Sequence, residues 1–266
     1  MKYNQYIKIC VAMLSLLSIG GCGPGDKDKK GRVALKEIPM EYGCAGLTHN
    51  EKYLICGTKY GTIVSIDPYT GKASKIYDVD RELGALAYMG NGRYLFERYE
   101  YDNYGYPYTF DIHKDLKNTL TRQIGSFSTG GLVYDQTSKL MYGTKGSTIF
   151  VRSLNGNFSN EGYSPLGGDN AMAQTDKYIY VVTDYEQAIV QFSKDEIIKS
   201  DNRVHPMHSK EIPYKNEGYF DMTFGISGMT IFRGDLFVYY RDGMIHKLDV
   251  NLLDYDDSVN VKMRTW

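Results

Sequence analysis

The chain has 266 residues, a formal net charge of −1 and 24% charged residues. This balance argues against a nucleic-acid partner, which would require a basic surface. The part of the chain after the first 32 residues is long enough for one sizeable domain with its own core. Tyrosine is abundant, with 25 residues against 10 phenylalanines and 1 tryptophan, and it suits both half-buried strands and wet binding surfaces.

Residues 1–21 have the three zones of an export signal. Lys2 and Lys8 supply a positive start, residues 9–19 are apolar, and Gly20-Gly21 offer small side chains to a peptidase. The apolar stretch is too short to span a bilayer, which needs roughly 20 apolar residues. Cleavage after residue 21 would leave 29 basic against 32 acidic residues, a net charge of −3.

The segment Leu17-Ser18-Ile19-Gly20-Gly21-Cys22 resembles the lipobox of bacterial lipoproteins. The resemblance implies that Cys22 carries lipid such as palmitate, becomes the first mature residue and anchors the protein in the cell envelope. Gly23 lacks the aspartate that favours inner-membrane retention in some of these proteins, which points to the outer membrane. Residues 22–32 are rich in glycine and charge and predict a flexible tether. The alternative is an ordinary cleaved signal with an incidental cysteine.

An apolar strand, a turn and a second apolar strand recur along the chain, as in a repeat architecture. The clearest copies, residues 53–67 and 140–151, share Gly-Thr-Lys at or near the turn. Each copy follows a segment of small residues and is flanked by a more polar segment. Three weaker copies lie at residues 94–112, where an insertion delays the second strand, 178–192 and 236–248.

A small inner strand, two apolar middle strands and a polar outer strand are typical of a β-propeller blade. Residues 57–72, with Asp67 and Gly71-Lys72, resemble the repeats of quinoprotein-like and YVTN-type propellers. We therefore predict an all-β fold, a β-propeller of about five, or six, four-stranded blades over residues 33–266. Helical periodicity is confined to one turn at residues 195–199.

Residues 34–40 predict an outer strand that has no blade of its own. Residues 36–40 nearly repeat residues 210–214, which should form an outer strand. The N-terminal copy would complete the last blade and remove an open sheet edge. Residues 259–264 compete for the same place.

Cys44 and Cys56 flank a turn around residues 49–51. If residues 47–48 pair with residues 52–53, the two cysteines lie opposite one another on adjacent strands, within reach of a disulfide. An exported compartment permits the bond. The alternative is two buried free thiols.

In a propeller, the loops between second and third strands and the loops between blades gather on one face. The insertion at residues 99–108 would project there with five tyrosines in ten residues, a composition typical of binding loops. The alternative is a hairpin whose tyrosines cover a neighbouring blade. The candidate binding residues are Lys59, Tyr60, Tyr99, Tyr101, Tyr104, Tyr106, Tyr108, Tyr185 and Arg241.

Signals for catalysis and metal binding are weak. His205 and His208 are close in sequence, but no third ligand accompanies them, so we expect no metal and no other cofactor. The expected inner strands carry no acidic residue apart from Asp221 before the last one, whereas five-bladed glycosidases place facing carboxylates there. One tryptophan, Trp266, does not supply the repeated tryptophan motif of quinoproteins.

The sequence predicts a membrane-anchored, non-enzymatic propeller that binds a protein or a glycan. One alternative is an envelope hydrolase or lyase acting on a glycan or lactone at the propeller channel, and another is a purely structural surface protein. Convergent carboxylates at the channel mouth would favour the enzyme. An uncharged channel filled by side chains, together with an exposed tyrosine patch, would favour the binding module.

Lipidation of Cys22 can be tested by metabolic labelling with a fatty-acid probe. We expect the native chain to incorporate the probe and the Cys22→Ala chain to lose it, because the cysteine thiol is the acylated group. Cys10→Ala, a change within the signal, should keep the label. Undiminished labelling of Cys22→Ala would refute the lipidation site.

Overall fold

The computed structural model describes residues 34–39, 43–79, 82–98, 108–109, 122–123, 130–163, 171–183, 188–205, 208–211, 226–240 and 243–248. The chain divides into the units Met1–Gly31 and Arg32–Trp266, and the described residues all belong to the second. The expected signal, Cys22 and the tether lie outside the described residues. Within the described part, no helix is long and apolar enough to cross a membrane.

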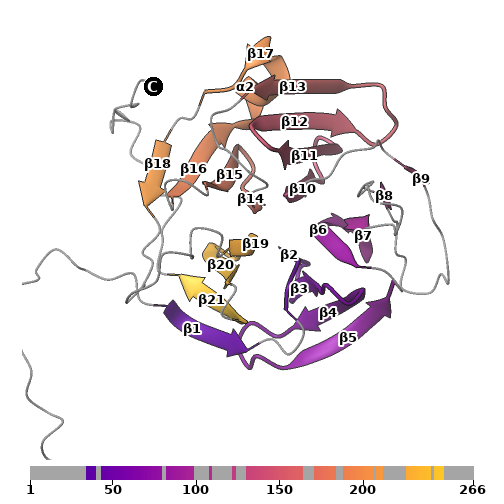
Figure 1. Cartoon of the computed structure of the whole chain (residues 1–266), viewed down its shortest axis with the longest axis vertical. Coiled ribbons are helices and arrows are strands. Elements are labelled where there is room, and N and C mark those ends of the chain that lie inside the picture. The colour runs from indigo at the N-terminus through magenta and orange to yellow at the C-terminus, as the bar shows by residue number, and fades with distance from the viewer. Residues whose placement is uncertain are drawn as a thin grey trace, which may run out of the picture. The chain divides into compact units, whose positions relative to one another are not determined.

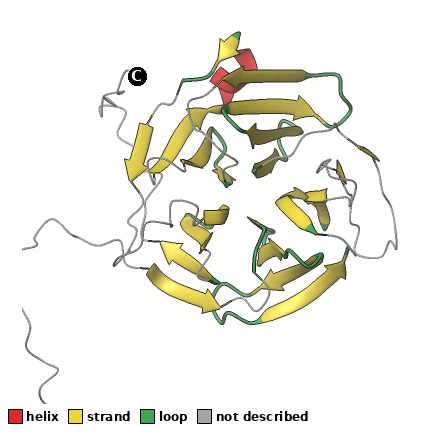
Figure 2. Cartoon of the chain, in the orientation of Figure 1, coloured by secondary structure: helices red, strands yellow, loops and turns green. Residues whose placement is uncertain are grey.

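The described residues form mainly antiparallel sheets (Figures 1 and 2). The first sheet contains, in order, β2 (Gly46–His49), β3 (Leu54–Gly57), β4 (Thr62–Ile66) and β5 (Ala73–Asp78). The next contains β6 (Leu83–Gly90) and β7 (Arg93–Arg98). A short ladder of β8 (Tyr108–Thr109) and β9 (Arg122–Gln123) follows, with β8 against β7.

The remaining sheets repeat this order. One contains β10 (Gly131–Asp135), β11 (Leu140–Lys145), β12 (Thr148–Ser153) and β13 (Ser159–Tyr163). Another contains β14 (Met172–Gln174), β15 (Tyr178–Thr183), β16 (Ala188–Ser193) and β18 (His208–Glu211). The last contains β19 (Ile226–Phe232), β20 (Asp235–Tyr240), β21 (Met244–Leu248) and β1 (Ala34–Pro39). The prediction of an all-β fold built from antiparallel four-stranded sheets is confirmed.

Local chemistry explains where the strands turn. Between β4 and β5, the Asp67 carboxylate accepts hydrogen bonds from the backbone amides of Tyr69 (2.7 Å) and Thr70 (2.9 Å). Gly71 then adopts a φ of 74°, which a residue with a side chain rarely takes. The chain reverses here because an aspartate that bonds its own following amides stabilises a turn.

Helix α2 (Lys194–Lys199) follows β16, where the sequence predicts one helical turn. The Ser193 hydroxyl accepts a hydrogen bond from the Glu196 amide and caps its N-terminus. After α2, the short strand β17 (Asn202–Arg203) pairs in parallel with β13 of the preceding sheet. The sequence did not indicate this strand, which covers an otherwise open sheet edge.

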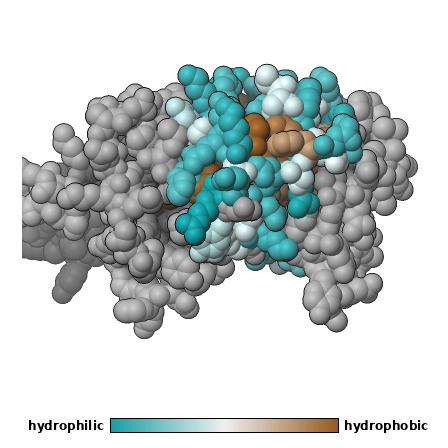
Figure 3. Space-filling view, turned by 90° about the horizontal axis from the view of Figure 1, so that it is seen from above, coloured by the Kyte–Doolittle hydropathy of each residue, from teal (hydrophilic) through white to brown (hydrophobic). Residues whose placement is uncertain are grey.

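In Figure 3, hydrophilic side chains dominate the described surface seen from above, with an apolar strip between them.

The innermost strands of the sheets contact one another in a closed cycle. β2 contacts β6 and β19, β10 contacts β6 and β14, and β14 contacts β19, so these strands surround a common centre (Figure 1). One apolar cluster fills the space between each pair of consecutive sheets. Along β3, Leu54 and Cys56 join the cluster shared with the last sheet, while Ile55 joins the cluster shared with β6 and β7. The strand is therefore buried on both faces, as its unbroken apolar sequence requires.

The N-terminal strand closes the last sheet. β1 pairs antiparallel with β21, with Ile38 opposite Ile245 and Pro39 opposite Met244. The prediction for residues 34–40 is confirmed over the described strand, and the competing residues 259–264 lie outside the described part. Because β1 precedes β2 in the chain but pairs in the last sheet, it joins the first and last sheets covalently.

Cys44 and Cys56 form a disulfide with a Cα–Cα distance of 5.7 Å. The bond was predicted as one of two possibilities, but the expected register is wrong by three residues, since Leu47 pairs with Cys56. The reason is the turn, which centres on residues 51–52: the Asn50 side chain accepts hydrogen bonds from the amides of Lys52 (2.8 Å) and Tyr53 (2.7 Å). Cys44 thus lies just before β2 and reaches Cys56 from the strand end.

Glycines set the spacing of the innermost strands. A Cβ at Gly46 would lie 2.6 Å from the Gly84 carbonyl oxygen, and a Cβ at Gly228 would lie 2.6 Å from the Leu47 Cβ. Real Cβ atoms do not come this close to other heavy atoms, so strands β2, β6 and β19 can approach as they do only without side chains at these positions. The small residues expected in the inner strands therefore have a direct steric cause.

We expect Gly46→Ala to lower the free energy of unfolding by about 1–3 kcal/mol, because the new methyl group overlaps the main chain of β6. Gly57→Ala is the matched control: Gly57 pairs with Gly46 across the hairpin, and its new methyl would meet only side chains, those of Leu83 at 3.4 Å and Leu86 at 3.6 Å. Urea denaturation of both variants measures the difference. Equal destabilisation by the two changes would contradict the steric argument.

Candidate functional site

A narrow cavity of about 60 Å³ lies between the innermost strands, and we call it the inner cavity. Every one of those strands contributes to its wall. The lining residues are uncharged apart from the histidine, whose state is discussed below. They are Leu47, Thr48, His49, Tyr88, Val133, Tyr134, Gln136, Met172, Ala173, Gln174, Met229 and Thr230.

The inner cavity lies toward the carboxyl ends of the innermost strands. His49, Asp135 and Gln174 end β2, β10 and β14, and Tyr88 lies near the end of β6. The turns that lead into the second strand of each sheet are at this end. Gln136 lines the cavity and is itself exposed, so the cavity reaches the surface on this face. The close contacts of Gly46 and Gly228 lie at the other end of their strands.

His49 is held as a neutral imidazole at the cavity wall. Burial lowers its pKa, and hydrogen bonds with the backbone of Asn50 and Ile231 only partly oppose this effect. Its Nδ1 lies 3.1 Å from the Asn50 carbonyl oxygen, and its ring lies 5.4 Å from the Phe232 ring. At neutral pH the cavity is therefore lined without a net charge.

Two strand-to-strand hydrogen bonds order the polar groups of the cavity. The Tyr88 amide donates to Thr48 Oγ1 at 3.3 Å, and Gln174 Nε2 donates to the Tyr134 carbonyl oxygen at 2.7 Å. The second bond fixes the orientation of the Gln174 amide, because only its nitrogen can donate. Gln174 Oε1 is buried and accepts no hydrogen bond from the described residues.

The tyrosines near the centre stay protonated. Burial raises the pKa of Tyr94 and of Tyr134, and it raises the pKa of Tyr142 to about 12. The Tyr88 and Tyr94 rings lie 5.3 Å apart. The phenols of Tyr94, Tyr134 and Tyr142 can form hydrogen bonds but cannot act as bases near neutral pH.

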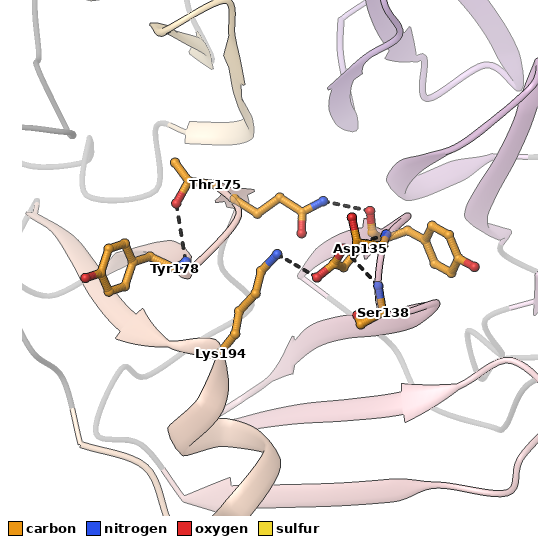
Figure 4. Close-up of polar contacts among 8 residues, drawn as sticks. Asp135, Ser138, Thr175, Tyr178 and Lys194 are labelled. Carbon is orange, nitrogen blue, oxygen red and sulfur yellow. Dashed lines mark hydrogen bonds and ion pairs between the residues drawn. The ribbon is translucent and has the colours of Figure 1, made fainter.

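A buried ion pair lies beside the inner cavity (Figure 4). Lys194 at the start of α2 lies 3.0 Å from an Asp135 carboxylate oxygen, and the side chains are 7% and 14% exposed. The other Asp135 oxygen accepts hydrogen bonds from the amides of Thr137 and Ser138. Burial raises the pKa of Asp135, but Lys194 and these hydrogen bonds outweigh it and hold the pKa below its usual value. Asp135 therefore joins two sheets as a carboxylate and is not available as a general acid.

Arg233 connects the first and last sheets on the same face. It follows Phe232 and donates hydrogen bonds to the Tyr69 hydroxyl (3.0 Å) and the Glu51 carbonyl oxygen (3.4 Å). Its guanidinium carbon also lies 4.9 Å from the centre of the Phe232 ring. The Tyr69 side chain is 68% exposed, whereas Phe232 is buried in the core.

The predicted binding residues are not brought together in the described part of the chain. Lys59 and Tyr60 lie in the turn between β3 and β4, and Tyr60 is 76% exposed. This turn is at the opposite end of the strands from the inner cavity. Tyr108 belongs to β8. The other predicted residues lie outside the described residues: Tyr99, Tyr101, Tyr104, Tyr106, Tyr185 and Arg241.

No group of three histidine, cysteine or acidic side chains that could hold a metal ion occurs among the described residues. His205 is exposed near α2, and its amide donates to Glu196 Oε1 at 2.9 Å. A second, open hollow of about 700 Å³ lies there, lined by acidic and basic residues of α2 and the following segment. It is a surface depression with mixed charge.

Sequence reasoning missed the inner cavity. It placed His49 in a turn around residues 49–51, whereas β2 continues through Thr48 to His49. The signal that could have located it is the position of polar residues just after the small inner segments. Extending the small inner segments, which end at residues 47, 133 and 173, by one residue toward the following turn reaches Thr48, Tyr134 and Gln174.

Comparisons with known proteins bear on the fold. No family model and no curated protein matches the chain. Among solved structures, it is similar to the Myxococcus xanthus glutaminyl cyclase, with 10% identity, a TM-score of 0.50, and 82% of this chain and 96% of that chain covered. The domain has a β-propeller fold.

Two further solved structures are similar to the domain at lower TM-scores. One is a nidogen/laminin complex, with 14% identity, 75% and 72% of the two chains covered and a TM-score of 0.49. The other is a streptogramin B lyase, with 12% identity, 81% and 97% coverage and a TM-score of 0.46. Likeness at 10–14% identity shows the fold alone, so function has to be argued from the residues of this chain.

We expect Lys194→Met to lower the free energy of unfolding at pH 7 by about 3 kcal/mol, because it leaves the buried Asp135 carboxylate without its counter-charge. The double variant Asp135→Asn/Lys194→Met should recover most of this loss. Thermal unfolding of the native chain, the single variant and the double variant measures both effects.

The same ion pair predicts a pH dependence. The folded-state pKa of Asp135 is below its unfolded value. The contribution of its carboxylate to the free energy of unfolding is therefore complete above the unfolded pKa, and it is lost as the pH falls through the folded pKa. Stability should therefore decline from about pH 5 to below pH 3. Lys194→Met should decline less over that interval, and an equal decline would contradict the role of the pair.

Proposed function

We propose that the chain is a lipid-anchored β-propeller of the bacterial cell envelope that acts as a non-enzymatic binding module for a protein or a glycan. The proposed propeller has five blades, because the innermost strands β2, β6, β10, β14 and β19 make a closed cycle of contacts. The lipobox-like sequence ending at Cys22 supports the anchor. The proposal places the protein at the outer membrane.

The observation that carries the binding function is the character of the inner cavity. Its described wall has apolar and neutral polar side chains and contains no aspartate, glutamate, lysine or arginine. Asp135, which directly precedes the lining residue Gln136, is held as a carboxylate by Lys194. Hydrolysis or elimination on a glycan or lactone would need an acid and a base facing a common point. A neutral cavity with fixed hydrogen-bonding groups instead suits recognition.

Tethering restricts where a partner can be met. The proposed tether, residues 22–32, spans at most roughly 30–35 Å when fully extended. A partner bound by the propeller would therefore be a component of the envelope close to the membrane surface.

The function is tested with the tagged, full-length chain solubilised from membranes in mild detergent. We expect it to retain a glycan or protein from envelope extracts, and to leave that partner chemically intact over hours. Periodate treatment of the extract separates a glycan from a protein partner, since it destroys vicinal diols of sugars. New reducing ends or a shortened product would favour the hydrolase or lyase, and the absence of any retained component would reject a binding module.

A further inference from the structure

The volume of the inner cavity limits what can enter it. Ligand pockets usually measure about 300–1,000 Å³, whereas this cavity measures about 60 Å³. It has room for a small appended group and not for a sugar ring or an amino-acid side chain with its backbone. The remainder of any ligand must lie outside, on the face where Gln136 is exposed.

The lining specifies the chemistry of that group. Leu47, Val133, Met172 and Met229 supply apolar contact, which a hydroxyl or an ion cannot use. Gln174 Oε1 is a buried acceptor that receives no hydrogen bond from the described residues. An acceptor buried without a partner is unfavourable, and a donor from a ligand would remove that cost.

The cavity also provides a donor. Thr48 Oγ1 accepts the Tyr88 amide, so its own hydroxyl proton remains available to an acceptor on a ligand. Neutral His49 and the absence of charged side chains among the lining residues disfavour an ammonium or a carboxylate. The fitting group is therefore small and neutral, with one donor, one acceptor and a methyl-sized apolar part.

We propose that the inner cavity receives the acetamido group of an N-acetylated sugar. Its N–H would bond Gln174 Oε1, its carbonyl would accept from the cavity hydroxyls, and its methyl would contact the apolar wall. The inference deepens the proposed binding function, on which it rests, and selects a glycan as the partner. The sugar ring would lie at the mouth of the cavity, on the face that also carries the exposed ring of Tyr69.

The test measures binding of N-acetylglucosamine, glucose and glucosamine to the full-length chain in detergent, by saturation-transfer NMR and titration. These probes differ only at the second carbon, which carries an acetamido, a hydroxyl or an ammonium group. We expect N-acetylglucosamine to bind at least tenfold more tightly than the other two. Gln174→Leu should lower that affinity about tenfold, because it removes the acceptor.

Thr230→Val is the second variant, because Gln174 also bonds the Tyr134 carbonyl and its loss could unfold the chain. This change keeps the shape of the lining residue and removes its hydroxyl, so it should lower the affinity for N-acetylglucosamine several-fold. Tyr163→Ser, at the exposed end of β13 away from the cavity, should leave the affinity unchanged. Equal affinity for the three sugars, or unchanged binding by both cavity variants, would overturn the acetamido site. The proposed function would then still stand if envelope extracts yield a partner, and would fall only if they yield none.

Discussion

The fold depends on how closely the innermost strands approach one another at one end. A side chain at Gly46 would meet the main chain of β6, and one at Gly228 would meet Leu47. Two residues further along β2 and β19 come Thr48 and Thr230, and Tyr88 lies near the end of β6. Glycine at one end thus permits the contact cycle, and larger polar residues at the other end line the inner cavity. Position along an inner strand decides whether a residue serves packing or a site.

The first and last sheets meet where the chain has to close on itself, and several different interactions concentrate there. β1 pairs with β21, the Ser227 hydroxyl donates to the Cys44 carbonyl oxygen at 2.6 Å, and Arg233 reaches Tyr69 and Glu51. The Cys44–Cys56 disulfide lies in the apolar cluster that these two sheets share. A disulfide closing a loop of this length stabilises by about 3 kcal/mol in the chain-entropy description. The junction is thus held by covalent, apolar and polar contacts together.

Much of the fold could be predicted because apolar runs, turn residues and small inner segments repeat along the chain. The β1 closure followed from the near repetition of residues 36–40 at 210–214. Register was beyond such reasoning: a three-residue shift between β2 and β3 depends on the Asn50 turn, and the apolar pattern tolerates both pairings. The cavity was missed because Gln174 and Thr48 are unremarkable in sequence, and only the contact cycle brings strands from distant repeats together.

Several charged groups on the cavity face are engaged in structural contacts. Asp135 and Lys194 neutralise one another between sheets, Arg233 bonds a hydroxyl and a carbonyl, and burial keeps His49 neutral. An ionic ligand entering the inner cavity would give up its hydration and meet no counter-charge among the lining residues, which is costly. A neutral group with its own donor and acceptor loses less water and gains the unsatisfied Gln174 oxygen. The electrostatics of the fold therefore select for neutral, hydrogen-bonding ligands before any particular contact is considered.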